Sequence, residues 1–233
     1  MSDWGDIQEV RCDLQSLGGY AKAAHDHSHS TCLYCGMGSK RVQEPESKFD
    51  IWRHLVREHI VPEKEADRKS LQRAVNKRFH KVPQSDQRAI CDCIDKMNGV
   101  SCCQLCNTFV GRYDKKESVK KAVDHFAAIL DSRIGEETRD LRSPIVHEWL
   151  KELGEAVLEV WKAKAIVARG KVKHTRGRFQ EMYPHFSLTH EREINRCNLD
   201  RKVQEWVNKC IEDFGKNPVD NRENRRRTSK GSS

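Results

Sequence analysis

Residues 31–60 read TCLYCGMGSKRVQEPESKFDIWRHLVREHI, and they hold the most informative motif of the chain. Cys32 and Cys35 are separated by two residues, and after eighteen intervening residues His54 and His59 follow in the spacing His-x4-His. Two thiolates on a tight turn and two imidazoles about one helical turn apart can complete the tetrahedral shell of Zn²⁺. We therefore predict a structural zinc site with these four ligands.

The second half of this stretch has the pattern of an amphipathic helix. Ser47 has a side chain that suits the N-cap position. The apolar contacts of the helix would come from Phe49, Ile51, Trp52, Leu55 and Val56. In such a helix His54 and His59 lie near one face, which is where a metal ion needs them.

With Cys32, Cys35, His54 and His59 at the ligand places, this stretch resembles the C2H2-type zinc finger. The resemblance covers about thirty of the 233 residues and implies a small hairpin-plus-helix unit held by metal. Its gap between cysteines and histidines is longer than the roughly twelve residues usual in fingers that read DNA. At the positions where such fingers contact bases, only Arg53 is a strong reader of guanine. Base-specific DNA recognition is therefore disfavoured.

A second Cys-x2-Cys motif, formed by Cys103 and Cys106, is followed after eighteen intervening residues by His125. Cys32 and Cys103 are 71 residues apart, and the same shift carries the first motif onto the second. We therefore predict an internal duplication of a finger-like unit. The copy has Leu130 in place of the second histidine. The alternatives for its fourth ligand are Asp131, Cys91, Cys93 and Cys102. The other interpretation is a unit that has lost its metal and buries its cysteines.

The composition favours an anionic partner and metal-bound cysteines. The formal net charge is +8 and the pI is about 9.0, which suits nucleic acid, an anionic membrane face or an acidic protein. The ten cysteines follow no N-terminal apolar signal, and no run of eighteen apolar residues occurs. We expect an intracellular protein of the nucleus or cytoplasm, without membrane association, whose cysteines bind metal rather than form disulfides.

Apolar periodicity predicts a mostly helical protein with two embedded zinc-finger-like units and a disordered basic C-terminal tail. Helices are expected over about 3–17, 64–80, 85–97, from Ser143 onward, and over about 190–214. The expected segments are an N-terminal helix and loop (1–27), a C2H2-like finger (28–61), a helical connector (62–99), a second, degenerate finger-like unit (100–132), a helical region with a basic stretch (133–217) and the tail (218–233).

An apolar seam follows Ser143, at alternating four- and three-residue steps. It consists of Val146, Leu150, Leu153, Val157 and Val160. Such a seam packs against another helix. We expect that helix to belong to the same chain, with self-association through residues 146–160 as the lesser alternative.

Seven cations and no acid occur between residues 162 and 178. They are Lys162, Lys164, Arg169, Lys171, Lys173, Arg176 and Arg178. With Gly170 and Gly177 among them, this stretch is interpreted as a basic connection between helices that suits a phosphate backbone. A solvated basic face is the alternative. We predict a zinc-binding, nucleic-acid-binding protein, with RNA or nonspecific backbone contact favoured. The alternative function is a zinc-stabilised scaffold or regulatory adaptor that binds other proteins.

The sequence has no motif typical of an enzyme. It contains no Gly-rich phosphate loop, no His-Glu-x2-His and no Gly-x-Ser-x-Gly. The predicted first zinc site has four protein ligands and therefore no open position for a substrate or water. We expect no catalytic residues and a structural role for the zinc.

Overall fold

The computed structural model describes residues 23–24, 27–28, 31–36, 55–103, 106–107, 116–132, 139–182 and 196–216; for residues 55, 103, 170–182 and 196–198 it describes the backbone alone. The elements in chain order are β1 (Leu55–His59), α4 (Glu63–Ala66), α5 (Arg68–Arg78), α6 (Gln84–Met97), β2 (Gly99–Cys103), α8 (Glu117–Asp131), α9 (Pro144–Met182) and α10 (Arg196–Lys216). The prediction of a mostly helical fold is confirmed.

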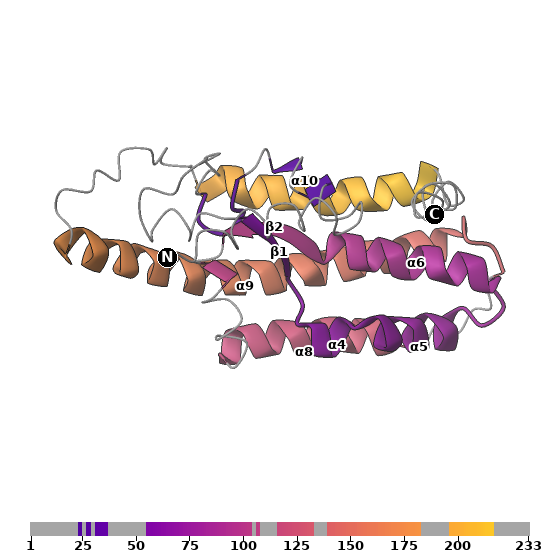
Figure 1. The fold of residues 1–233 in the computed structure, drawn as a ribbon. Coiled ribbons are helices and arrows are strands. Elements are labelled where there is room, and N and C mark those ends of the chain that lie inside the picture. The colour runs from indigo at the N-terminus through magenta and orange to yellow at the C-terminus, as the bar shows by residue number, and fades with distance from the viewer. Residues whose placement is uncertain are drawn as a thin grey trace, which may run out of the picture.

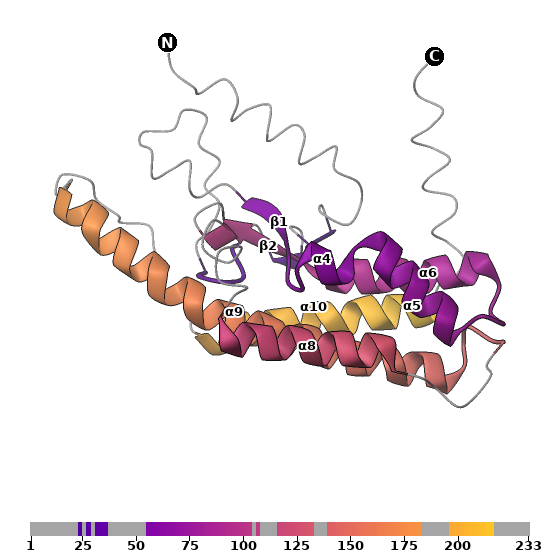
Figure 2. The ribbon, with the colours of Figure 1, turned by 90° about the horizontal axis from the view of Figure 1, so that it is seen from below.

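The helices run along one common direction, and the small sheet lies at one end of α6 (Figure 1). Helix α8 packs on α9, α5 packs on α6, and α10 packs on both α6 and α9. Figure 2 shows that the C-terminal part of α9 continues beyond the other helices. Helix α9 therefore has one part inside the bundle and one part outside it.

Three buried tryptophans occupy the centre of the core. Trp149 and Trp206 are 1% and 2% exposed, and Trp161 is completely buried. The ring of Trp149 meets that of Phe79 edge to face, with 5.3 Å between the centroids. The indole N–H of Trp206 donates to the Gly99 carbonyl at 2.9 Å, which ties α10 to β2. Large aromatic side chains of this kind contribute much of the apolar area buried in a core.

The apolar seam of α9 is buried inside the chain. Val146, Leu150, Leu153, Val157 and Val160 are all completely buried. Helix α10 comes very close to this part of α9, because a Cβ atom on Gly154 would lie 2.7 Å from Val207 Cγ1. The seam therefore packs against helices of its own chain, as its spacing predicts.

The predicted helices on either side of Pro83 are present. In α5 the side chains of Leu71 and Val75 are buried, and so is Phe79 directly after it. Helix α6 ends at Met97, as expected, but Pro83 occupies its N-cap and makes no side-chain capping hydrogen bond. Ser85, where the helix is predicted to begin, lies inside it, and its hydroxyl donates to Asp86 Oδ1 at 3.1 Å.

Strands β1 and β2 pair antiparallel, with Leu55 opposite Cys103 and His59 opposite Gly99. The turn between α6 and β2 holds the chain that leaves β1. The side-chain oxygen of Asn98 accepts from Val61 N–H at 2.7 Å, and its amide donates to the Val61 carbonyl at 3.1 Å. Because Asn98 is only 1% exposed, these two hydrogen bonds satisfy its buried amide.

The predicted helix that carries His54 and His59 is wrong for residues 55–59, because they form strand β1. The physical reason is a long-range pairing. The partner residues Leu55 and Cys103 are 48 positions apart in the sequence. Local apolar spacing carries no information about a partner at that distance, and tertiary context often overrides local preference.

Two other predictions also need correction. Under the proposed duplication, residues 55–59 correspond to 126–130, but the first set is a strand and the second lies within α8. The described parts of the two units therefore differ in structure. The basic connection at 162–178 is part of α9, whose helix continues through Gly170 and Gly177. An isolated glycine costs a helix only about 1 kcal/mol, which neighbouring turns can offset.

The predicted helix at 3–17, His54 and the tail from residue 218 lie outside the described residues. Within the described part of the chain, no helix combines the length and the apolar character needed to cross a membrane.

Candidate metal centre

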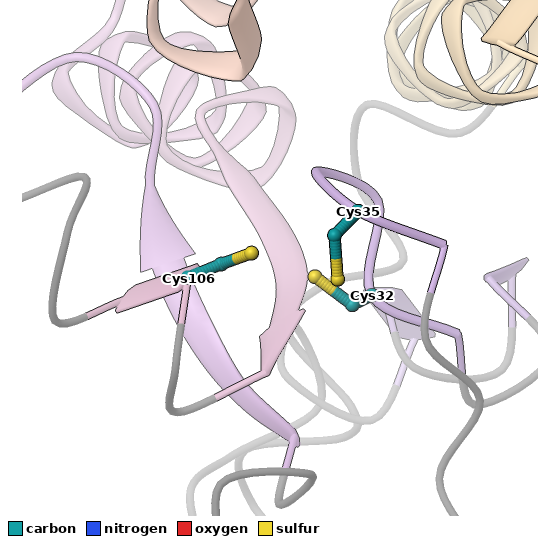
Figure 3. Close-up of side chains that lie close together, drawn as sticks. All are labelled: Cys32, Cys35 and Cys106. Carbon is teal, nitrogen blue, oxygen red and sulfur yellow. The ribbon is translucent and has the colours of Figure 1, made fainter. Parts of the chain in front are cut away.

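Three cysteines from two distant parts of the chain meet at one place. The Sγ atoms of Cys32, Cys35 and Cys106 all lie within 4.8 Å of one another. Figure 3 shows the three side chains directed toward one another. In a tetrahedral zinc–thiolate site, bonds of about 2.3 Å separate the sulfur atoms by about 3.8 Å. Separations of up to 4.8 Å would need to shorten only slightly to reach this value, so the group could hold a metal ion.

Cys32 and Cys35 lie on a tight turn that closes at Gly36. The Gly36 N–H donates to the Cys32 carbonyl at 2.8 Å, and the φ of Gly36 is 79°. This left-handed conformation favours glycine, because a Cβ atom would be crowded there. The turn is attached to β2, since Leu33 N–H donates to the Ser101 carbonyl at 2.9 Å. Backbone hydrogen bonds therefore fix how both thiols are presented.

Cys106 lies just beyond β2, in a short helical turn at residues 106–107. Cys32 and Cys106 are completely buried, whereas Cys35 is partly exposed. An ionised thiolate in an apolar interior is costly unless a positive charge compensates it. A divalent cation bound by all three sulfur atoms would supply that compensation.

Arg169 joins the cysteine turn to two helices. Its Nε donates to the carbonyl of Tyr34, one of the two residues between Cys32 and Cys35, at 2.6 Å. Its Nη2 lies 3.3 Å from Asp200 Oδ1 on α10. The guanidinium also lies 5.5 Å from the centroid of the Trp161 ring. These contacts place the turn against α9 and α10 and engage the charge of Arg169 within the fold.

Tyr34 contributes a buried hydroxyl beside the thiols. Among the described residues its oxygen has no hydrogen-bond partner. Burial raises the pKa of Tyr34 well above its usual range, and the nearby Glu58 and cysteines raise it further. The phenol therefore stays protonated and adds no negative charge to the cysteine group.

Lys164 anchors β1 to α9. Its side chain is 1% exposed, and its Nζ lies 3.5 Å from Glu58 Oε1 and 3.3 Å from the His59 carbonyl. Glu58 is itself 14% exposed. A buried charge is tolerated only with a partner of opposite sign and hydrogen bonds to its protons. Lys164 and Glu58 therefore stabilise each other, and each would be costly alone.

His59, predicted as a ligand, is not part of the cysteine group. It ends β1, and its Nε2 lies 3.9 Å from Asp95 Oδ1. Burial lowers the pKa of His59, with a further contribution from Arg57. The cause of the misplacement is the strand: in β1 the imidazole is positioned by the sheet and not by a helix that faces the cysteines. His54 lies outside the described residues.

The second predicted unit is divided by the fold. Cys106 joins Cys32 and Cys35, while His125 is exposed on α8 and its Nδ1 lies 2.8 Å from Glu159 Oε2. For Cys103 only the backbone, at the end of β2, is described. His125 therefore does not belong to the group that contains Cys106.

None of the alternatives for a fourth ligand in the second unit belongs to the cysteine group. Asp131 is paired with Lys77 at 3.7 Å, and Cys102 is buried in β2. The thiol of Cys93 donates to the Cys210 carbonyl at 3.6 Å. Burial raises the pKa of Cys91 to about 12 and that of Cys93 further. Cys91 and Cys93 are therefore neutral thiols of the core.

The sequence did contain a signal for this arrangement. Two Cys-x2-Cys motifs in one chain are typical of a single zinc site with one pair of ligands from each. The matching histidine spacings favoured two separate units instead. Pairing across the two motifs depends on β1, β2 and the Cys32–Gly36 turn coming together, which local spacing does not reveal.

The seven cations predicted to contact nucleic acid do not share one kind of surroundings. Lys164 and Arg169 are engaged in ion pairs within the fold and are structural residues. Lys162 is exposed on α9. Only the backbone is described for Lys171, Lys173, Arg176 and Arg178.

Comparison of the chain with protein-family models, with curated proteins and with solved structures gave no match.

Proposed function

We propose that Cys32, Cys35 and Cys106 bind one structural Zn²⁺, with Cys103 or His54 as the fourth ligand. The meeting of three thiols supports the metal, because soft thiolate ligands favour zinc over magnesium or calcium. Cys103 is the stronger candidate for the fourth place. Its spacing to Cys106 repeats that of Cys32 to Cys35, and its backbone ends the strand to which the first turn is attached.

The role of this zinc would be structural. A centre with four protein ligands has no open position for catalysis. The ion would connect the Cys32–Gly36 turn to the chain that follows β2. Structural zinc in small domains contributes on the order of 10 kcal/mol to folding, so the sheet end of the molecule would depend on it.

Native mass spectrometry with ligand variants tests the site. We expect one zinc per chain; two ions would favour two separate finger units, and none would reject the site. Cys106→Ser should lose the ion, while the matched variant His125→Ala, outside the cysteine group, should keep it. Cys103→Ser should weaken zinc binding. If it does not and His54→Ala does, His54 is the fourth ligand.

We also propose that the chain binds nucleic acid through contacts to the phosphate backbone, with RNA favoured over base-specific DNA reading. The net charge of +8 supports an anionic partner. The observation that carries this proposal is the part of α9 that continues beyond the other helices (Figure 2). The sequence places Lys171, Lys173, Arg176 and Arg178 on that part.

Fluorescence anisotropy with labelled single-stranded RNA, duplex RNA and duplex DNA at several salt concentrations tests this function. We expect binding that weakens steeply with salt and that falls when the four cations at 171, 173, 176 and 178 are changed to Gln. Replacing four exposed lysines at 120, 121, 151 and 209 provides the matched control. If no nucleic acid binds at about 50 mM salt, where phosphate contacts are strong, the scaffold or adaptor function is favoured.

A further inference from the structure

Helix α5 carries a second basic surface that the sequence analysis did not identify. One side of the helix packs into the bundle through Leu71, Ala74 and Val75. The opposite side carries Lys69, Arg73 and Lys77, all exposed. In Figure 1 this helix lies along the outer edge of the bundle. Unlike the end of α9, this surface consists of side chains whose positions are described.

The three cations form one stripe. They recur every four residues, so successive side chains are turned by about 40° and displaced by about 6 Å along the helix axis. We call Lys69, Arg73 and Lys77 the α5 stripe. A stripe with this regular displacement can contact several phosphates of one strand at the same time.

Helix α5 itself contains no acid; the exposed acids near it are Glu63 and Glu65 on α4 and Asp131 on α8. The exposed charged side chains of residues 68–97 are Arg68, Lys69, Arg73, Lys77 and Arg88. The acids of the same segment, Asp86, Asp92 and Asp95, are only partly exposed. Eight basic and three acidic residues give this segment a formal charge of +5, out of +8 for the whole chain. A large share of the net positive charge is therefore concentrated here.

The other helices distribute their charge differently. On α10 Arg201 is paired with Glu205 at 3.3 Å, and on α8 Lys121 is paired with Glu117 at 3.5 Å. Exposed pairs at this helical spacing partly cancel each other's field. Among the described helices, α5 stands apart because it contains no acidic residue.

The contacts of the stripe within the protein are weak. Lys69 makes no ion pair within the described part of the chain, and Arg73 Nη2 donates only to the Ser70 hydroxyl at 3.1 Å. Lys77 Nζ lies 3.7 Å from the exposed carboxylate of Asp131 and donates a long hydrogen bond, 3.4 Å, to the carbonyl of the same residue. An exposed ion pair of this kind contributes about 0–1 kcal/mol. A phosphate group can therefore replace these contacts at little cost.

From this arrangement we propose that the α5 stripe binds the phosphate backbone of nucleic acid. The proposal rests on the proposed nucleic-acid function and names a surface for it. Charge complementarity favours a phosphate polymer, and each neutralised phosphate releases a counterion. A membrane surface is less suitable, because a helix that lies on a bilayer inserts its apolar side, and that side of α5 is buried against the bundle.

The test compares two triple variants of the full chain. The first changes the stripe, Lys69→Gln, Arg73→Gln and Lys77→Gln. The second is the matched control, with Lys120→Gln, Lys151→Gln and Lys209→Gln, which removes the same charge from exposed positions on α8, α9 and α10. Circular dichroism and thermal melting of both variants establish that each is folded like the native chain.

Binding to a labelled single-stranded RNA is measured from low to moderate salt. The stripe variant should bind at least tenfold more weakly at low salt. Its plot of log affinity against log salt should be less steep by about 2, since each phosphate contact contributes about 0.7 for a single strand. The control variant should change far less in both measurements.

Two outcomes overturn the proposal while leaving the nucleic-acid function intact: equal losses in both variants, or a stripe variant that binds RNA like the native chain. A native chain that binds no nucleic acid removes the proposed function itself. Binding to vesicles of anionic lipid is measured in parallel. If the stripe substitutions abolish vesicle binding and leave RNA binding unchanged, the partner class is wrong.

Discussion

Residues 68–81 and residues 162–178 are both rich in lysine and arginine, yet three cations of the first segment and two of the second have opposite surroundings. The first segment has six cations in fourteen residues and the second has seven in seventeen. On α5 the stripe faces solvent. On α9 Lys164 is 1% exposed and Arg169 18%, and each is paired with a carboxylate. Similar charge in the sequence therefore faces solvent at Lys69, Arg73 and Lys77, and holds elements of the fold together at Lys164 and Arg169.

The difference follows from how many neighbours each helix has. Helix α5 packs mainly on α6, also contacts α4 and α8, and leaves Lys69, Arg73 and Lys77 exposed. At Lys164 and Arg169, by contrast, α9 meets β1, the Cys32–Gly36 turn and α10 at once. Cations there lose water on every side and need acids or carbonyls in its place.

Arg78 is the intermediate case. It belongs to the basic segment of α5, but it lies 4.8 Å from the centroid of the Trp149 ring. Burial lowers the pKa of Arg78 to about 10, which the nearby Glu152 partly opposes. A side chain is thus removed from the binding surface when the helix turns it toward the core. Counting cations overestimates the charge that a partner can reach.

The largest expected effect on stability comes from removing the proposed metal, whose site lies in the region where Arg169 contacts the cysteine turn. Chelation, or Cys106→Ser, should destabilise the fold by on the order of 10 kcal/mol, because structural zinc contributes about that much to folding. The Tyr34 carbonyl would then no longer be held in place as the hydrogen-bond acceptor of Arg169. Thermal melting followed by circular dichroism measures the loss, with His125→Ala as the control. Identical melting with and without chelator would contradict the proposed zinc site.

The next effect concerns the buried cation itself. Lys164→Ala should cost about 3–5 kcal/mol of unfolding free energy, because the largely buried Glu58 would lose the ammonium group that compensates its charge. The matched substitution Lys69→Ala on α5 should change stability by no more than about 0.5 kcal/mol. Urea denaturation gives both values. Similar losses of unfolding free energy for the two substitutions would contradict a buried Lys164 and an exposed Lys69.

A smaller effect is expected at Arg169. Arg169→Gln should cost about 1–3 kcal/mol, because it removes the charged hydrogen bonds to the Tyr34 carbonyl and to Asp200. Arg169→Lys should recover only part of this loss, since an ammonium group lacks the planar fork that reaches both acceptors. Denaturation curves measure the stability, and native mass spectrometry should still detect the zinc. Full recovery by lysine would argue against the geometric role.

The smallest effect on stability is expected for the exposed cations of the α5 stripe. Changing Lys69, Arg73 and Lys77 together to Gln should alter the unfolding free energy by less than about 1.5 kcal/mol in total, because exposed substitutions usually change it by no more than about 0.5 each. The measurement is urea denaturation at two salt concentrations. A loss of several kcal/mol would mean that the stripe stabilises the fold. RNA binding by the stripe variant would then have to be measured under conditions in which the variant is folded.

The sequence alone predicted most of the helical structure. Apolar residues at three- and four-residue steps located α5, α6 and the beginning of α9, because each of these helices buries one continuous side against the bundle. The helix predicted from Ser143 onward begins at Pro144, where a missing N–H costs nothing. The same periodicity placed the α9 seam inside the chain.

Only the tertiary structure decided which cysteines share a site. Cys-x2-Cys spacing identified Cys32, Cys35, Cys103 and Cys106 as candidate ligands. Nothing in that spacing tells which pair meets which partner. The pairing of β1 with β2 and the hydrogen bond from Leu33 to Ser101 bring Cys106 to the first pair and leave His125 on an exposed face.

The sequence by itself determined the helices, the ligand types and the total charge, because these depend on residues close together in the chain. The tertiary structure decided which thiols converge and which cations remain in solvent. Both outcomes depend on what lies across the fold from each side chain, and that is fixed by contacts between residues far apart in the sequence.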